Sequence, residues 1–217
     1  MPETTKRAPL NARRILEAAV ALADTIGIDS FTIRKLATAL DTAPMTIYHH
    51  VRSKRELIDG MVEIVFDEIR KPPVDLHWKA AIRVRCLSAR EVLGRHRWAA
   101  PLMESRTAPG PANLAHHDAV IACLRRGGLS LPLTAHAYAI LDSFVYGFAF
   151  EEATLPGSDS AELARIAHEM SADLQLEHYP ALAEFTAGHV LQPGYSFGDS
   201  FAFGLDLIIE GLERASR

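Results

Sequence analysis

Apolar residues recur at helical spacing along almost the whole chain, and this periodicity is the feature that most restricts the fold. In residues 10–27, for example, Ile15, Ala19, Leu22 and Ile26 fall on one face of a helix. Segments with the strict alternation of a half-buried strand are nearly absent. Clusters of Gly and Pro interrupt the helical pattern at intervals. The sequence therefore predicts an all-α protein.

Short polar residues mark the starts of the first predicted helices. Asn11 and Thr32 are suited to cap the first two helices, because their side-chain oxygens can accept hydrogen bonds from N–H groups of the first turn. Pro44 suits the first turn of a third helix, where its missing N–H costs nothing. Ser53, with Glu56 three residues later, has the pattern of a capping box and starts a fourth helix. The third helix is expected over about 44–50, and further helices over about 76–95, 98–106, 111–127, 132–152, 159–176 and 201–217, with residues 186–200 as a loop.

The composition is that of an ordinary globular protein without a secretion or membrane signal. Hydrophobic residues make up 48% of the chain and charged residues 23%, yet no apolar run reaches the roughly 18 residues needed to span a bilayer. The N-terminus is charged and lacks the apolar region of a signal peptide. The chain has two cysteines, Cys86 and Cys123, which for its size favours a reducing compartment, and they form no C-x-x-C pair that would offer a metal or redox site. We expect a cytoplasmic protein with no membrane partner, no metal site and no cofactor.

The charge is distributed unevenly along the chain. Residues 1–58 hold nine Lys or Arg against six Asp or Glu, whereas the remainder holds 14 against 21. A basic N-terminal segment on an acidic body is typical of a protein that binds a polyanion with one part and has another task for the rest. We therefore expect a DNA-binding domain over 1–58, a linker formed by the fourth helix to about residue 71, and a helical domain over 72–217.

Polar side chains cluster tightly in the third predicted helix. Tyr48, His49 and His50 lie between Ile47 and Val51, whose spacing of four places both on the inner face of the helix. Three short helices, with a tight turn before the third, match the helix-turn-helix plan, in which the third helix lies in the major groove of DNA. The alternative is that the three polar residues are an ordinary solvated surface, but the order of the preceding helices and turn favours DNA binding.

The segment from 10 to about 69 resembles the DNA-binding domain of the TetR family of bacterial transcriptional repressors. The match rests on about ten positions at fixed spacing. The matching residues are Thr32, Ile33, Arg34, Leu36, Ala37, Thr46, Ile47, Tyr48, His50, Val51, Lys54 and Leu57.

The resemblance implies a role for each matching polar position. Pro44, Met45, Thr46 and His49 match positions that read the DNA sequence. Arg34 matches a position that contacts a base or a phosphate. The positions that contact phosphates are Thr32, Tyr48, His50 and Lys54. Ala43 departs from the family, which often has a capping Ser there, so Thr42 is expected to cap the third helix instead. The apolar side chains among the base-reading residues favour contacts such as those to a thymine methyl group.

A head of this size needs a second copy to bind a palindromic operator tightly, so a homodimer interface is expected in the body. The closing helix is similar to that of the tetracycline-repressor branch, where it forms a four-helix bundle with the helix corresponding to 132–152. The alternative is that both apolar faces are core of a single chain. The expected interface residues are Phe201, Leu205, Ile208, Ile209 and Leu212, and on the other helix Tyr138, Leu141, Val145 and Phe148.

The same branch holds its ligand inside the helical body, which implies an effector site here. Met103 stands where the tetracycline repressors have a His that ligates the drug-bound magnesium, although their assisting Glu is kept as Glu151. Because magnesium prefers oxygen ligands, we expect a mostly apolar or aromatic effector, with an anionic group if an arginine of the site binds it. Ordinary core packing is the alternative for each residue. The expected site comprises Arg85, Ala89, Met103, Arg106, Phe144, Phe148 and Glu151.

The function that these features favour is that of a ligand-responsive transcriptional regulator, a repressor that a small effector releases from its operator. The opposite response to ligand remains an alternative, as does a helical small-molecule sensor that no longer binds DNA specifically. An enzyme is disfavoured. His116 and His117, adjacent on one helix, point about 100° apart and cannot easily share a metal, and the sequence has no G-x-S-x-G motif and no Gly-rich phosphate loop.

Overall fold

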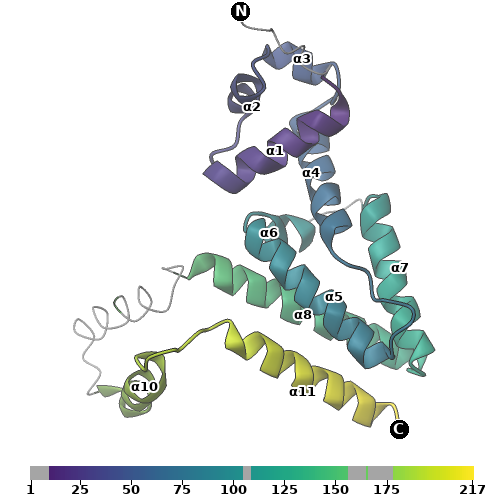
Figure 1. The fold of residues 1–217 in the computed structure, drawn as a ribbon, viewed down its shortest axis with the longest axis vertical. Coiled ribbons are helices and arrows are strands. Elements are labelled where there is room, and N and C mark those ends of the chain that lie inside the picture. Colours follow the sequence, from purple (N-terminus) through teal and green to yellow (C-terminus); the bar gives the residue numbers. More distant parts are fainter. Residues whose placement is uncertain (1–9, 105–108, 156–164, 166–177) are drawn as a thin grey trace, which may run out of the picture.

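The computed structural model describes residues 10–104, 109–155, 165 and 178–217. Within these residues every regular element is a helix, which confirms the predicted fold class (Figure 1). The predicted helix over 159–176 lies outside the described residues, apart from residue 165. The α-helices are α1 (Ala12–Ile26), α2 (Ile33–Ala39), α3 (Pro44–Tyr48), α4 (Lys54–Glu68), α5 (Trp78–Arg95), α6 (Ala99–Glu104), α7 (Pro111–Arg126), α8 (Leu131–Thr154), α10 (Pro180–Phe185) and α11 (Asp199–Ala215), and a π-helix, η2, covers Thr186–Val190.

Helices α1–α3 form a head at one end of the molecule, and α4 leads from it into the body (Figure 1). The head has its own apolar core, to which Ile15, Leu36 and Ile47 contribute fully buried side chains. Helix α4 packs on α1 in the head and on α7 in the body, so it belongs to both parts. The backbone N–H of Ala112 near the start of α7 donates to Glu63 Oε2 at 2.7 Å, which ties α4 to the body.

The predicted caps of α1, α2 and α4 are confirmed. The side chains of Asn11, Thr32 and Ser53 each accept a hydrogen bond from the backbone N–H three residues later. Glu56 differs in one detail from a standard capping box, because its carboxylate accepts from the N–H of the residue before Ser53. The prediction that Thr42 caps α3 is wrong, since no side chain caps this helix. Helix α3 also ends two residues earlier than predicted.

Helices α5, α7, α8 and α11 pack together as the body, in which α5 and α8 make the most extensive contact. The prediction of a loop over 186–200 is wrong for its first five residues, which form η2 as a continuation of α10, and for its last two, which begin α11. The large apolar side chains of α10, which η2 continues, are not buried: Leu182 and Phe185 are 49% and 54% exposed. Without a buried stripe, the segment gives no periodic signal for a helix. Among the described residues, no helix has the length and apolar character to cross a membrane.

Candidate DNA interface and effector site

The residues predicted to bind DNA lie on α2 and its N-cap, on α3 and the residues that follow it, and at the start of α4. Ile47 and Val51 are buried in the core of the head, as predicted from their spacing. Met45 is 66% exposed and Tyr48 41% exposed, so both side chains are open to a partner on the outer side of α3. Thr46 is half-buried. The remaining exposed residues of the predicted set are Thr32, Arg34, Pro44, His49, His50 and Lys54.

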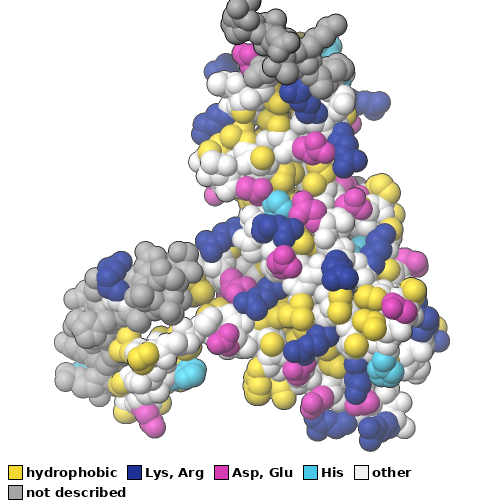
Figure 2. Space-filling view, viewed as in Figure 1, with side chains coloured by type: hydrophobic (Ala, Val, Ile, Leu, Met, Phe, Trp, Pro, Cys, Tyr) yellow, Lys and Arg dark blue, Asp and Glu magenta, His cyan; other side chains and the backbone are white. Residues whose placement is uncertain are grey.

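Two of the predicted phosphate ligands already make contacts within the head. Thr32 Oγ1 accepts from the N–H of Lys35 at 3.2 Å, and its hydroxyl hydrogen can still donate to a phosphate. Lys54 Nζ donates to the carbonyl of Phe31 at 3.4 Å, which holds this ammonium group beside the start of α2. Because an ammonium group has three donors, the contact does not exhaust its capacity. Figure 2 shows Lys and Arg side chains around the head, interspersed with acidic ones.

A buried ion pair lies at the centre of the body. The Arg85 guanidinium on α5 is fully buried, and one of its terminal nitrogens lies 2.7 Å from Asp142 Oδ1 on α8. These two atoms are not aligned as a hydrogen bond, so the contact is ionic. Burial lowers the pKa of Arg85, but the opposing charges, led by Asp142, outweigh it and the pKa is raised. Arg85 is therefore charged and already has a counterion within the chain.

The contact between Arg85 and His116 determines which nitrogen of this histidine carries the proton. Arg85 Nε donates to His116 Nε2 at 2.9 Å, so Nε2 accepts and the hydrogen of the neutral ring must lie on Nδ1. Burial, with the charge of Arg85 as the next cause, lowers the pKa of His116 to about 3, which keeps the ring neutral. His116 Nδ1 is buried and has no hydrogen-bond partner among the described residues. It is a donor that an acceptor oxygen could satisfy.

A second histidine extends this polar cluster toward the surface. The Tyr138 hydroxyl lies 2.6 Å from His117 Nδ1, and the same nitrogen lies 3.9 Å from Asp142 Oδ2. Burial lowers the pKa of His117, although Asp142 acts in the opposite direction. The ring of Phe66 on α4 packs against His117, with ring centroids 5.8 Å apart. The cluster thus contacts the helix that leads to the head.

We expect His116 to make the protein less stable in acid. Its pKa is about 3 in the folded chain and about 6.5 when unfolded, so the unfolded chain takes up the proton first. Stability is therefore fully present above about pH 6.5 and falls by up to about 1.4 kcal/mol per pH unit as the pH drops toward about 3. Urea unfolding at about pH 7 and about pH 5 measures the effect. A His116→Asn variant should lose this part of the pH dependence, and an unchanged slope would contradict the assignment.

The residues predicted to line an effector site do not all lie together. Phe144 and Phe148 belong to an aromatic cluster with Phe197 and Phe201, in which Phe148 stacks on Phe197 with centroids 4.7 Å apart. The guanidinium of Arg90 covers Phe148 at 5.3 Å and pairs with a glutamate of α8. This arginine was absent from the prediction. Of the other predicted residues, Ala89 and Met103 are buried, Glu151 is exposed, and Arg106 lies outside the described residues.

The apolar stripe predicted for dimerisation is largely core of this chain. Phe201, Leu205, Ile209 and Leu212 are 0–6% exposed, so their assignment to the interface is wrong. The same holds for Leu141, Val145 and Phe148 on α8. Both helices also have an outward side that is open. That of α11 carries Phe203 and Leu207, 68% and 52% exposed, and that of α8 carries Ile140 and Phe150, 48% and 52% exposed; together they are called the open face of α8 and α11.

The fold and its exposed third helix define a helix-turn-helix transcriptional regulator with a helical body. The family model described as bacterial regulatory proteins, tetR family, matches residues 15–61, and the model of the tetracyclin repressor-like C-terminal domain matches residues 72–215. The chain belongs to the TetR family of bacterial transcriptional regulators, which confirms the resemblance found in its sequence.

Individual relatives extend over nearly the whole chain. The HTH-type transcriptional repressor DrrR1 of Streptomyces coeruleorubidus is 30% identical over 98% of this chain and 80% of its own length. The TetR family protein ActR of Streptomyces coelicolor, in complex with actinorhodin, has a TM-score of 0.77 at 29% identity, covering 96% of this chain and 98% of ActR. A TetR variant from Acinetobacter baumannii AYE, in complex with minocycline, has a TM-score of 0.67 at 27% identity and covers 94% of each chain. These relatives are regulators.

Proposed function

We propose that this regulator is a repressor that binds a palindromic operator as a homodimer and is released by a small effector. The single observation that carries the proposal is the exposed α3 surface, where Met45 and Tyr48 stand open beside His49 and His50. The domain matches support a division into a DNA-binding domain over 1–58, a linker to about 71 and an effector domain over 72–217. Because bacterial chromosomal DNA lies in the cytoplasm, a protein that binds an operator there is inferred to be cytoplasmic.

A homodimer through α8 and α11 supports two-headed binding. The open face of these helices presents aromatic and aliphatic side chains, which a soluble monomer rarely exposes together. Gly147 on α8 has no atom within 4 Å of an added Cβ, so this position leaves room for close approach of a second helix. We infer that a second copy covers this face and places two heads about one helical turn of DNA apart, roughly 34–36 Å.

The polar core suggests the kind of effector that the body binds. Because Arg85 is neutralised by Asp142, an anionic group on the ligand has less to gain there than an uncharged acceptor has at His116 Nδ1–H. The nearby Phe66 favours an aromatic molecule. ActR and a TetR variant have been determined with actinorhodin and minocycline, respectively. We infer an aromatic effector with a carbonyl or similar acceptor oxygen.

The first test is fluorescence anisotropy of the purified protein on DNA fragments tiled across the region upstream of its own gene. We expect one fragment to bind far above scrambled competitor at fixed salt and to saturate at two or four chains per site. Aromatic carbonyl compounds can then be screened for release of that complex. Fragments that never bind above competitor would favour a sensor that has lost specific DNA binding, or an operator elsewhere, which genome-wide selection of bound fragments would distinguish.

We expect Tyr48→Ala and Lys54→Ala to weaken binding to all DNA sequences similarly, because both side chains are assigned to phosphates. Lys54→Ala should also lower the slope of log affinity against log salt by about 0.9, the contribution of one neutralised phosphate, whereas Tyr48→Ala should leave the slope unchanged because the phenol carries no charge. The matched control is Lys79→Ala, which removes a lysine from the body, where it pairs with Glu213. Anisotropy titrations at several salt concentrations measure the slopes. A loss restricted to the operator would instead assign the residue to base reading.

A further inference from the structure

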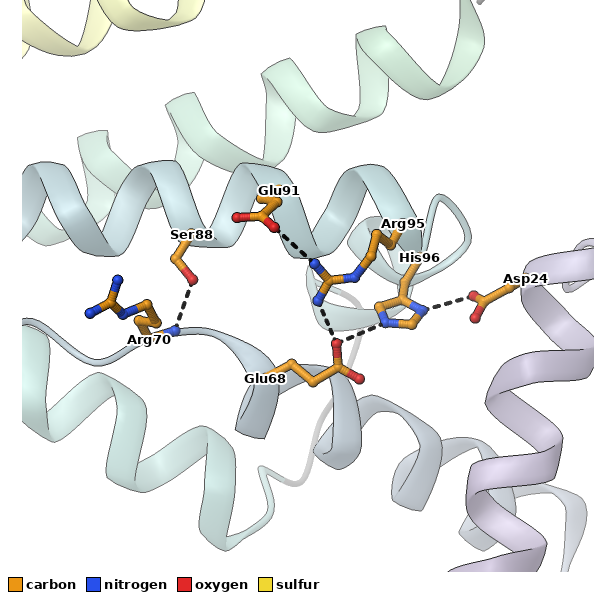
Figure 3. A network of polar contacts seen from close by, with 7 residues as sticks. All are labelled: Asp24, Glu68, Arg70, Ser88, Glu91, Arg95 and His96. Atoms are coloured by element: carbon orange, nitrogen blue, oxygen red, sulfur yellow. Dashed lines mark hydrogen bonds and ion pairs between the residues drawn. The ribbon is translucent and has the colours of Figure 1, made fainter.

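The head has a second attachment to the body besides α4. Asp24, in the last turns of α1, accepts a hydrogen bond from Trp98 Nε1 at 2.7 Å, and the same oxygen lies 2.8 Å from His96 Nδ1 (Figure 3 shows Asp24 and His96). His96 follows the last residue of α5, and Trp98 precedes α6. Both body side chains are 6–7% exposed. A carboxylate of the head is thus held by two buried groups of the body.

The other nitrogen of His96 faces a second carboxylate. His96 Nε2 lies 3.2 Å from Glu68 Oε2 at the end of α4, and Arg95 donates to the same oxygen at 2.7 Å (Figure 3). Arg95 also pairs with Glu91 on its own helix. The groups that face His96 are therefore Asp24 from α1, Glu68 from α4 and the adjacent Arg95 from α5. The imidazole ring therefore bridges α1, which belongs to the head, and α4, which leads from the head into the body.

This bridge is complete in only one protonation state of His96. An ionised carboxylate only accepts hydrogen bonds, so each ring nitrogen that faces one must donate. A neutral imidazole has a single N–H, whereas the imidazolium has two. Glu68 is ionised near neutral pH: burial would raise its pKa, but hydrogen bonds from Arg95 and His96 outweigh burial and lower it. When the imidazolium loses a proton, one ring nitrogen faces its carboxylate with a lone pair instead of an N–H. That contact then becomes repulsive.

The bridge is placed where it can control the angle of the head. A single connecting helix leaves a domain free to bend and turn about its attachment, and a second attachment away from that helix removes this freedom. We propose that Asp24, His96 and Trp98 form a proton-dependent latch that fixes the head on the body, and that His96 is a positioning residue for operator binding. The DNA part of this inference rests on the proposed function, because two heads must match successive major grooves.

A double-mutant cycle tests the latch without DNA. Asp24→Asn, His96→Gln and the double variant are unfolded in urea at fixed protein concentration, at about pH 6 and about pH 8.5, which lie below and above the ordinary pKa of an imidazole, about 6.5. We expect the two substitutions to be coupled roughly tenfold in the unfolding equilibrium constant at the lower pH, as for one hydrogen bond to a charged group. The coupling should be clearly weaker at the higher pH, because a neutral imidazole has one N–H for two carboxylates and no charge.

The matched control is Glu17→Gln, which removes a carboxylate of α1 whose ion pair within the described part of the chain is local, with Arg13. It should show no coupling to His96→Gln at either pH. Coupling that is the same at both pH values would make the contact merely structural, and coupling that is absent at both would remove the latch altogether.

Operator binding provides the second readout. At about pH 6, His96→Gln is expected to change the affinity for the full palindrome about fivefold or more, in the range of typical couplings between sites. Affinity for a single half-site should stay unchanged, because one head can bind at any angle to its body. The difference on the palindrome should shrink at about pH 8.5. An equal change on the half-site would place the effect inside the head and overturn the proposal. If no operator exists, the proposed function fails, while the unfolding cycle still decides whether the latch exists.

Discussion

Phe203→Asp is expected to convert the protein from a dimer into a monomer and to lower operator affinity by at least about 100-fold, the loss of a linked second binding event. Phe203 is 68% exposed in the single chain, on the open face that α11 shares with α8. In the dimer a second copy would bury it, and an unpaired carboxylate in an apolar interface is strongly unfavourable. Sedimentation equilibrium gives the oligomeric state, and anisotropy on the operator gives the affinity.

The control for this variant is Leu114→Asp, which introduces the same charge at a leucine that is 55% exposed on α7. Leu114→Asp should remain a dimer and bind the operator as the wild type does. If Phe203→Asp also remains a dimer, the open face of α8 and α11 is not the interface. A monomeric Phe203→Asp protein with undiminished affinity would show that one head suffices for operator binding.

The head was predictable from the sequence because its signals are local. A helix start with a capping side chain is visible within three or four residues, and Asn11, Thr32 and Ser53 all cap the helices that they were predicted to cap. The failure at α3 has the same basis. Ala43 occupies the cap position and has no side-chain acceptor, while Thr42 lies one residue before that position and makes no side-chain cap.

The interface was predicted on α8 and α11, but most of the residues named for it are buried within the single chain. Helix α11 is apolar on two sides: Phe201 and Leu205 face the core of the chain, while Phe203 and Leu207 face outward. Periodicity identifies an apolar face but does not state whether the same chain or a second copy buries it. The sequence therefore indicates that apolar residues cover much of α11. Only the packing of α5 and α8 against it shows which of these residues the same chain buries.

The polar contacts that define the body were not predictable from spacing. Arg85 lies on α5 and its partners on α7 and α8, so that 31 residues separate it from His116. The latch has the same character, because Asp24 and His96 are 72 residues apart. Such pairs become visible only when the helices are packed. The resemblance to the family indicated Arg85 as a ligand residue, but it could not indicate that Asp142 already neutralises its charge.

Arg85→Leu is expected to destabilise the protein by about 3–5 kcal/mol, the usual cost of removing one partner of a buried ion pair. The variant leaves the Asp142 carboxylate buried without its counterion and leaves His116 Nε2 without its donor. Asp142 then has to be protonated or drawn toward water, and both cost free energy. Urea unfolding at about pH 7 measures the change.

Two further variants separate the buried charge from lost packing. In the double variant Arg85→Leu with Asp142→Leu no charge is left unpaired, so most of the lost stability should return. Arg83→Leu serves as the matched control, because Arg83 lies on the same helix and pairs with Asp206 at the surface. Such an exposed pair contributes at most about 1 kcal/mol. If Arg85→Leu costs no more than Arg83→Leu, Asp142 is not held as a buried charge. In that case Arg85 is free to bind an anionic group of the effector.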